Sequence, residues 1–139
     1  MPESNVPDAS DPLDVYEYAI VRVVPRVERA EFLNAGVVLW CRAREHLQAR
    51  TVFDPDRLRL LVPGPGLDVV AVARHVTALE RICAGDPRAG AVSDEAKGAR
   101  FRWLTAPRST VVQTSPVHCG LTADPGAELE RLLGAFVGR

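Results

Sequence analysis

The stretch Val15–Val24, VYEYAIVRVV, decides the fold of this chain. Its β-branched and aromatic side chains are typical of a strand. Strict alternation would place the even-numbered residues on one face of that strand and the odd-numbered residues on the other. Pro25 follows, and we expect it to end the strand because proline cannot donate to a sheet ladder.

Two further apolar stretches extend this strand into a sheet. Leu33–Cys41 predicts a second strand buried on both faces, and Leu47–Phe53 predicts a third, shorter one. The connections are short, so the simplest topology is an antiparallel meander of three strands. Gly36 indicates a bulge or a close approach of the neighbouring backbone.

Residues that are typical of helix starts and ends occur in the rest of the chain. Asp54-Pro55 and Asp124-Pro125 each combine an N-cap residue with a first-turn proline, so we expect short helices to Leu61 and to about Phe136. A longer helix should begin at Gly66 or Asp68 and end near Cys83, with Gly85 as the residue that stops it.

The sequence therefore predicts an α+β fold. Arg100–Leu104 and Val111–Thr114 are candidate strands, which gives an antiparallel sheet of about five strands with one long and two shorter helices packed on it. Residues 1–14 are acidic and proline-rich and indicate a disordered leader, followed by a single domain over residues 15–139.

Composition excludes several classes of function. No apolar run reaches the roughly 18–20 residues of a membrane span, and the leader lacks the pattern of a signal peptide, so we expect a cytoplasmic protein. The net charge of -1 gives no basic field for nucleic acid. Three cysteines without a C-x-x-C pair argue against a disulfide framework, and the scattered histidines predict neither a metal site nor another cofactor.

The segment Arg100–Gly120 holds the densest group of recognition-competent side chains. In a strand, Arg100 and Arg102 would point outward while Phe101 and Trp103 anchor the core. The outward arginines, with Arg108 and its neighbouring hydroxyls, could hold a phosphate or carboxylate. The alternative is a solvated arginine face, paired with acidic groups such as Glu17, Glu28 or Glu31.

Several parts of the chain resemble a known family. The matching stretches are YEYAIVRVVP (16–25), EFLNAGVVL (31–39), FRWLTAPRST (101–110), Gln113 and SPVH (115–118). They are similar to the bacterial family called "domain of unknown function 3037", which has no established activity. The resemblance implies a partner, a HipA-like kinase. The motif positions whose chemistry exceeds what packing requires are Glu31, Asn34, Arg102, Arg108, Ser109, Thr110, Gln113 and His118.

Three functions remain open at this stage. The first is a binding or regulatory module that acts through protein contact, which predicts an exposed apolar patch or an unpaired sheet edge. The second is an enzyme or binder for an anionic small molecule, phosphorylated or nucleotide-like. It requires Arg102, Arg108, Ser109 and His118 to converge on one pocket. The third is a structural subunit of a homo-oligomer.

Overall fold

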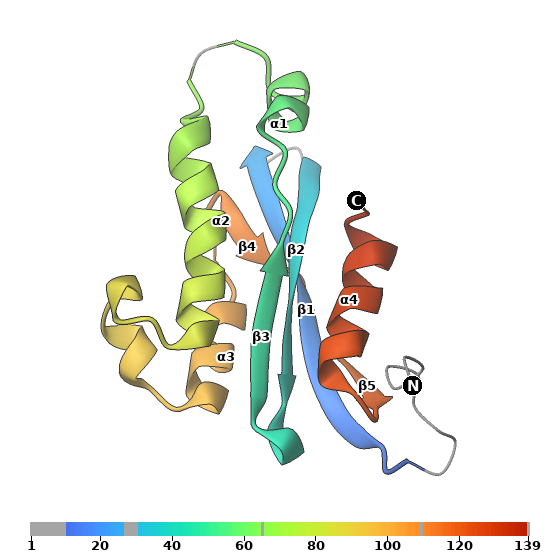
Figure 1. Cartoon of the computed structure of the whole chain (residues 1–139). Helices are drawn as coiled ribbons and strands as arrows, with labels where there is room; N and C mark the ends of the chain where they lie inside the picture. The colour runs from blue at the N-terminus through green and yellow to red at the C-terminus, as the bar shows by residue number, and fades with distance from the viewer. Residues whose placement is uncertain (1–10, 27–30, 65, 109, 139) are drawn as a thin grey trace, which may run out of the picture.

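The fold is an antiparallel sheet between two helical layers (Figure 1). The computed structural model describes residues 11–26, 31–64, 66–108 and 110–138. The strands in these ranges are β1 (Asp14–Arg26), β2 (Glu31–Cys41), β3 (His46–Thr51), β4 (Val112–Thr114) and β5 (His118–Thr122). The α-helices are α1 (Pro55–Leu61), α2 (Val69–Ala84), α3 (Lys97–Thr105) and α4 (Pro125–Phe136). Short 3-10 turns span Arg42–Arg44, Pro87–Ala89 and Ala91–Asp94.

Strand β1 lies at the centre of the sheet. It pairs with β2 along one edge, and β3 follows β2 to give the order β3-β2-β1-β4. Its other edge is shared, because β5 pairs with residues 14–18 and β4 pairs with residues 21–23. All of these pairings are antiparallel, which confirms the predicted α+β class and the three-stranded meander.

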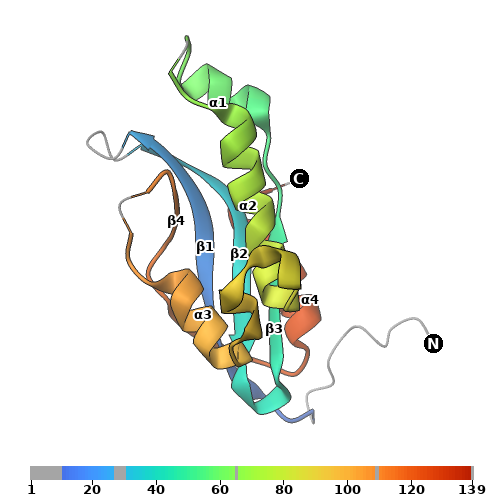
Figure 2. The same cartoon turned by 90° about the vertical axis from the view of Figure 1, so that its left-hand side faces the viewer.

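The alternation of β1 sorts its side chains between two cores. Odd-numbered residues such as Val21 pack with α2 and α3, and we call this side the α2 face. Even-numbered residues such as Ile20 pack with Leu129 of α4, and we call this side the α4 face. Figure 2 shows α2 and α3 lying together in front of the sheet, with α4 behind it. The two-sided burial follows directly from a period of two in an apolar strand.

The helix boundaries follow the capping chemistry. The carboxylates of Asp54, Asp68 and Asp124 accept hydrogen bonds from the first-turn N–H groups of α1, α2 and α4, respectively. Gly85 ends α2 in the left-handed region, at φ 73°. Asp54, Asp124 and Gly85 were predicted as caps, and the structure confirms them. Of the two predicted starts of the long helix, Gly66 and Asp68, the structure selects Asp68.

Pro25 does not end β1, contrary to expectation. The strand continues to Arg26, and the pairing with β2 shifts register between Val23 and Arg26. The missing N–H of proline falls in this irregularity, so no ladder bond is lost. Gly36 was expected to mark a close approach and does so, because a Cβ there would lie 2.6 Å from the carbonyl oxygen of Arg50.

The predicted strand Arg100–Leu104 is wrong, since these residues form most of α3. Arg100, Phe101 and Leu104 are buried at helical spacing, whereas Trp103 is 47% exposed and does not anchor the core. The fifth strand is β5, which pairs with β1. Of the predicted leader, residues 1–10 lie outside the described part of the chain, and β1 begins at Asp14.

Candidate functional site

The residues predicted to form one pocket lie on different sides of the sheet. His118 pairs with Tyr18 across β5 and β1, and the two rings meet on the α4 face at 5.5 Å between centroids. Arg102 and Arg108 belong to α3 and the turn after it, on the α2 face. Ser109 lies outside the described residues. The convergence that an enzyme or anion site at Arg100–Gly120 requires is therefore not met by the described side chains.

Arg102 is occupied by an ion pair. Its Nη1 and Nη2 donate to the two carboxylate oxygens of Glu17, at 2.8 and 2.7 Å. These hydrogen bonds raise the pKa of the Arg102 guanidinium. The Arg102 side chain is 59% exposed, so the pair is solvated and contributes little to stability.

Arg100 and Arg108 each cap the C-terminus of a helix. Arg100 is buried, and its Nη1 donates to the carbonyl oxygens of Ile82 and Cys83 at the end of α2, at 2.7 and 3.0 Å. Arg108 donates to the carbonyls of Trp103 and Leu104 and lies 4.3 Å above the indole of Trp103. The last carbonyls of a helix lack partners, and cations are favourable there. Arg100 was expected to point outward, and the structure corrects this.

Thr110 and Gln113 are engaged locally. The hydroxyl of Thr110 donates to the carbonyl of Val112 at 2.8 Å, and Gln113 Nε2 donates to the carbonyl of Thr110 at 2.6 Å. Polar side chains in turns commonly satisfy the neighbouring backbone in this way. Both residues shape the entry to β4.

Strand pairing nevertheless places two of the predicted site residues, Asn34 and Gln113, beside Arg22. Asn34, Arg22 and Gln113 form one cross-strand row on the α4 face, and we call it the polar row. Asn34 Nδ2 donates to the carbonyl of Phe136 at the end of α4, at 2.9 Å. Among the described residues, Asn34 Oδ1 and Arg22 Nε are buried and have no hydrogen-bond partner, as is also true of Arg100 Nε. Buried polar atoms without a hydrogen-bond partner are uncommon in proteins.

An apolar surface adjoins the polar row where β2 begins. We call it the α1 surface, and it consists of Phe32, Leu33, Val52, Leu60 and Leu61. Leu60 is 83% exposed and Phe32 47%. Hollows of about 400 and 70 Å³ lie side by side here and share Leu33 and Arg57. Asn34 lines the smaller hollow, and Arg22 lies 4.3 Å above the Phe32 ring, so the two features are continuous.

Glu31 stands at the first position of β2, beside the α1 surface. Its side chain lies outside the described part of the structure.

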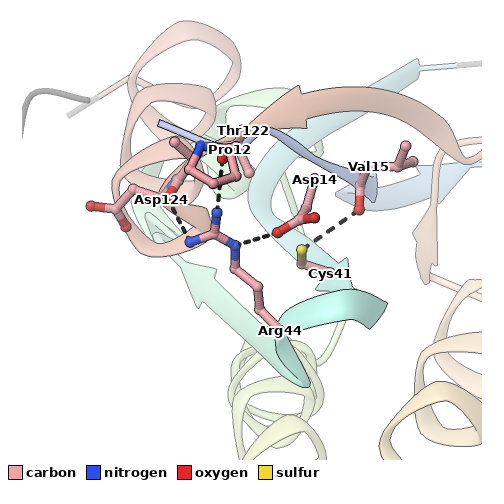
Figure 3. A network of polar contacts seen from close by, with 8 residues as sticks. Pro12, Asp14, Val15, Cys41, Arg44, Thr122 and Asp124 are labelled. Carbon is pink, nitrogen blue, oxygen red and sulfur yellow. Dashed lines mark hydrogen bonds and ion pairs between the residues drawn. The ribbon is translucent and has the colours of Figure 1, made fainter. Parts of the chain in front are cut away.

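Arg44 provides a contrast to Arg22 (Figure 3). All three of its guanidinium nitrogens are engaged: Nε by Asp14 at 2.7 Å, Nη1 by the carbonyl of Ala123 and Nη2 by that of Pro12. This arginine joins the start of β1 to the turn before α4 through three of its five N–H groups. By contrast, Arg22 Nε has no hydrogen-bond partner within the described residues.

Three ionisable side chains with shifted pKa values lie together on the α4 face: Tyr16, Glu128 and Arg131. Burial and a hydrogen bond to Glu128 raise the pKa of Tyr16 to about 12. The ion pair with Arg131 and the tyrosine hydroxyl lower the pKa of Glu128. The three groups satisfy one another and join α4 to β1. We therefore assign them to the fold rather than to catalysis.

The described residues contain no group of three His, Cys, Asp or Glu side chains that could hold a metal ion. Across the same residues, no helix is long and apolar enough to cross a membrane. The α1 surface and polar row place exposed apolar side chains beside the arginine cation of Arg22, a combination that occurs in protein interfaces.

Sequence reasoning overlooked Arg22, Phe32 and Leu60. A signal for Arg22 was available, because it is the charged residue on the otherwise aromatic and aliphatic even-numbered face of Val15–Val24. Leu60 follows a buried Leu58 in a short helix, and nothing local distinguishes an exposed leucine from a buried one.

Comparison with known protein families gives a match over most of the chain. The family model described as "Protein of unknown function (DUF3037)" matches residues 18–137. No curated protein and no solved structure matches the chain.

Proposed function

The chain belongs to the DUF3037 family of proteins of unknown function, and from that premise we propose that it is a cytoplasmic binding module that acts through contact with another protein. The partner that we propose is a HipA-like kinase, as the resemblance in the sequence implies. The observation that carries the proposal is the α1 surface beside the polar row.

The first support for the proposal is a group of exposed apolar side chains. Phe32, Val52, Leu60 and Leu61 are all at least 36% exposed and lie around adjoining hollows. Single exposed leucines are ordinary, whereas a cluster around a concavity is typical of an interface. Aromatic anchors with arginine at their rim are the usual energetic centres of such interfaces.

The polar row supplies the second support. Within the described residues, the one interaction assigned to the Arg22 side chain is its contact with Phe32. A partner that places a carboxylate or a backbone carbonyl beside Arg22 would pair with its guanidinium. Hydrogen bonds made in a desolvated setting add specificity to the apolar contact.

The test is a titration of the purified chain against a HipA-like kinase from the same genome. Leu60→Glu places a charge in the centre of the α1 surface at a side chain that is 83% exposed, so the fold should be unaffected. We expect affinity to fall at least about 30-fold, which corresponds to a hot-spot loss of about 2 kcal/mol. Trp103→Glu is the matched control, because Trp103 is 47% exposed on α3, away from α1 (Figure 1).

Arg22→Met tests the polar row separately, since methionine retains the contact with Phe32 and removes the donor. We expect a loss of affinity smaller than that of Leu60→Glu. Equal affinity of the wild type and Leu60→Glu would refute the assignment of the interface, and absence of any binding by the wild type would refute the proposed partner. Melting temperatures of all variants establish that they remain folded.

A further inference from the structure

The two outer edges of the sheet differ in how well they are protected from pairing with another strand. At the β3 edge, the carboxylate of Glu80 accepts from both the N–H and the hydroxyl of Thr51, at 2.6 and 2.7 Å. Arg50 and Glu130 form an ion pair between β3 and α4, at 2.6 Å. Charged side chains and covering helices are the usual means by which a protein prevents its edge strands from pairing with others. The β3 edge is thus protected.

The direction of the backbone at the β5 edge follows from Ile20. Its carbonyl accepts from the N–H of Ser115 and its N–H donates to the Ser115 hydroxyl, both at 2.8 Å. Even-numbered residues of this part of β1 therefore direct their backbone toward β4 and β5. Tyr16 and Tyr18 are paired with Gly120 and His118, so these two β5 residues face β1.

The intervening residues of β5 consequently face outward. Cys119 and Leu121 direct their N–H and C=O groups away from β1, and both residues are exposed. No lysine, arginine, aspartate or glutamate occurs in β5, whose sequence is HCGLT. An exposed edge strand of this composition is a template for another strand.

The side chains beside this edge are apolar on one face. Leu121 is 61% exposed and Val15, its cross-strand partner, is 59% exposed; Leu13 continues the patch at 58%. We call these three residues the β5 patch. The nearby carboxylate of Glu17 is neutralised by Arg102, so the patch carries no unpaired charge from that residue. On the opposite face, Gly120 lies directly beneath the ring of Tyr16 and has no side chain of its own.

We propose that β5 pairs antiparallel with β5 of a second copy of this chain, about a twofold axis at Gly120. In that register Cys119 of each copy lies opposite Leu121 of the other, and these are the residues whose backbone groups face outward. The two β5 patches then lie on the same face and form one continuous apolar surface across the axis. A surface that complements itself in this way is the requirement for a closed twofold dimer.

A second copy fits the edge better than an unrelated strand because the two edges are identical and related by the twofold axis. The outward N–H and C=O groups of Cys119 in each copy then bond to those of Leu121 in the other. The axis passes through a glycine, which permits close approach of the two backbones. Without a charged side chain on β5, two identical edges meet without like-charge repulsion.

The test is the mass of the full chain in solution by light scattering, together with thiol cross-linking. We expect twice the chain mass of 15.1 kDa. A short bismaleimide should link the two copies through Cys119, because Cys41 and Cys83 are buried. Leu121→Glu should give the monomer, and Leu60→Glu should remain dimeric, which separates this interface from the α1 surface.

A backbone variant tests strand pairing itself. Cys119→Pro removes an outward N–H and leaves the bonds to β1 intact, so it should yield monomer, whereas Cys119→Ser should remain dimeric. A monomeric wild type, including one that binds only an unrelated protein through this edge, would overturn the proposal. So would a Cys119→Pro variant that is folded and still dimeric, because its dimer could not depend on that hydrogen bond.

Discussion

The buried guanidinium of Arg100 gives the most informative stability prediction. Arg100 is 6% exposed, and its Nη1 donates to the last carbonyls of α2. Ile82 O also accepts from the N–H of Gly85, so the carbonyl of Cys83 depends most on the arginine. Arg100→Met preserves much of the packing volume and removes the donor.

The expected magnitude follows from these contacts. A buried carbonyl without a partner costs roughly 1–3 kcal/mol, and a hydrogen bond from a charged donor contributes about 1.5–3 kcal/mol. Relief of the desolvation of a buried cation offsets part of this sum. We therefore expect Arg100→Met to lower the free energy of unfolding by about 2 kcal/mol, which lowers Tm by about 6–8 °C in a chain of this size.

Urea denaturation monitored by circular dichroism is the appropriate assay. The midpoint should fall while the slope m is unchanged, since the surface exposed on unfolding is the same. Arg74→Met, at an exposed position of α2, the helix that Arg100 caps, is the matched control and should change stability by less than about 0.5 kcal/mol. A more stable Arg100→Met variant would refute the reasoning, because desolvation of the guanidinium would then outweigh its capping bonds.

Three further outcomes are expected. Gly36→Ala should destabilise the chain by about 2–3 kcal/mol because its Cβ meets neighbouring backbone, whereas Gly134→Ala, with open space in α4, should stabilise it by about 0.5–1 kcal/mol; thermal melting distinguishes them. The lowered folded-state pKa of Glu128 contributes stability above the unfolded carboxyl pKa that is lost as pH falls through the folded value. The difference in stability between wild type and Glu128→Gln should therefore shrink in acid, as denaturation at several pH values would reveal. Maleimide should modify Cys119 rapidly and Cys83 only after unfolding, because burial raises the pKa of Cys83 to about 12; mass spectrometry of the labelled peptides measures this.

The parts of the fold that the sequence predicts correctly have local causes. Asp54, Asp68 and Asp124 cap helices through bonds to residues two or three positions later, so each signal is contained within one turn. Val15–Val24 alternates over ten residues, which is long enough to separate a strand from a helix. By contrast, five residues at Arg100–Leu104 fit either period, and contacts with α2 select the helix.

The candidate site could not be predicted in the same way. Asn34 and Gln113 meet at Arg22 through strand register, at sequence separations of 12 and 91 residues. Nothing near any one of these residues specifies the others. The density of polar groups at Arg100–Gly120 was a misleading guide, because Arg100, Arg108 and Thr110 satisfy nearby backbone carbonyls. Polar groups that serve the fold and polar groups left for a partner look alike until their bonds are known.

The shared edge of β1 imposes an order on folding. The β1–β2 and β2–β3 pairings involve only the first 51 residues. The opposite edge of β1 pairs with β4 and β5, which come much later in the chain: Tyr18 and its partner His118 are separated by 100 residues. During synthesis, the central strand therefore emerges long before its second set of partners. Contacts of such long range slow folding and leave an apolar edge open to other chains in the interval. We expect the β1–β2–β3 hairpins to form early and the C-terminal segment, with β4, β5 and α4, to complete the sheet last.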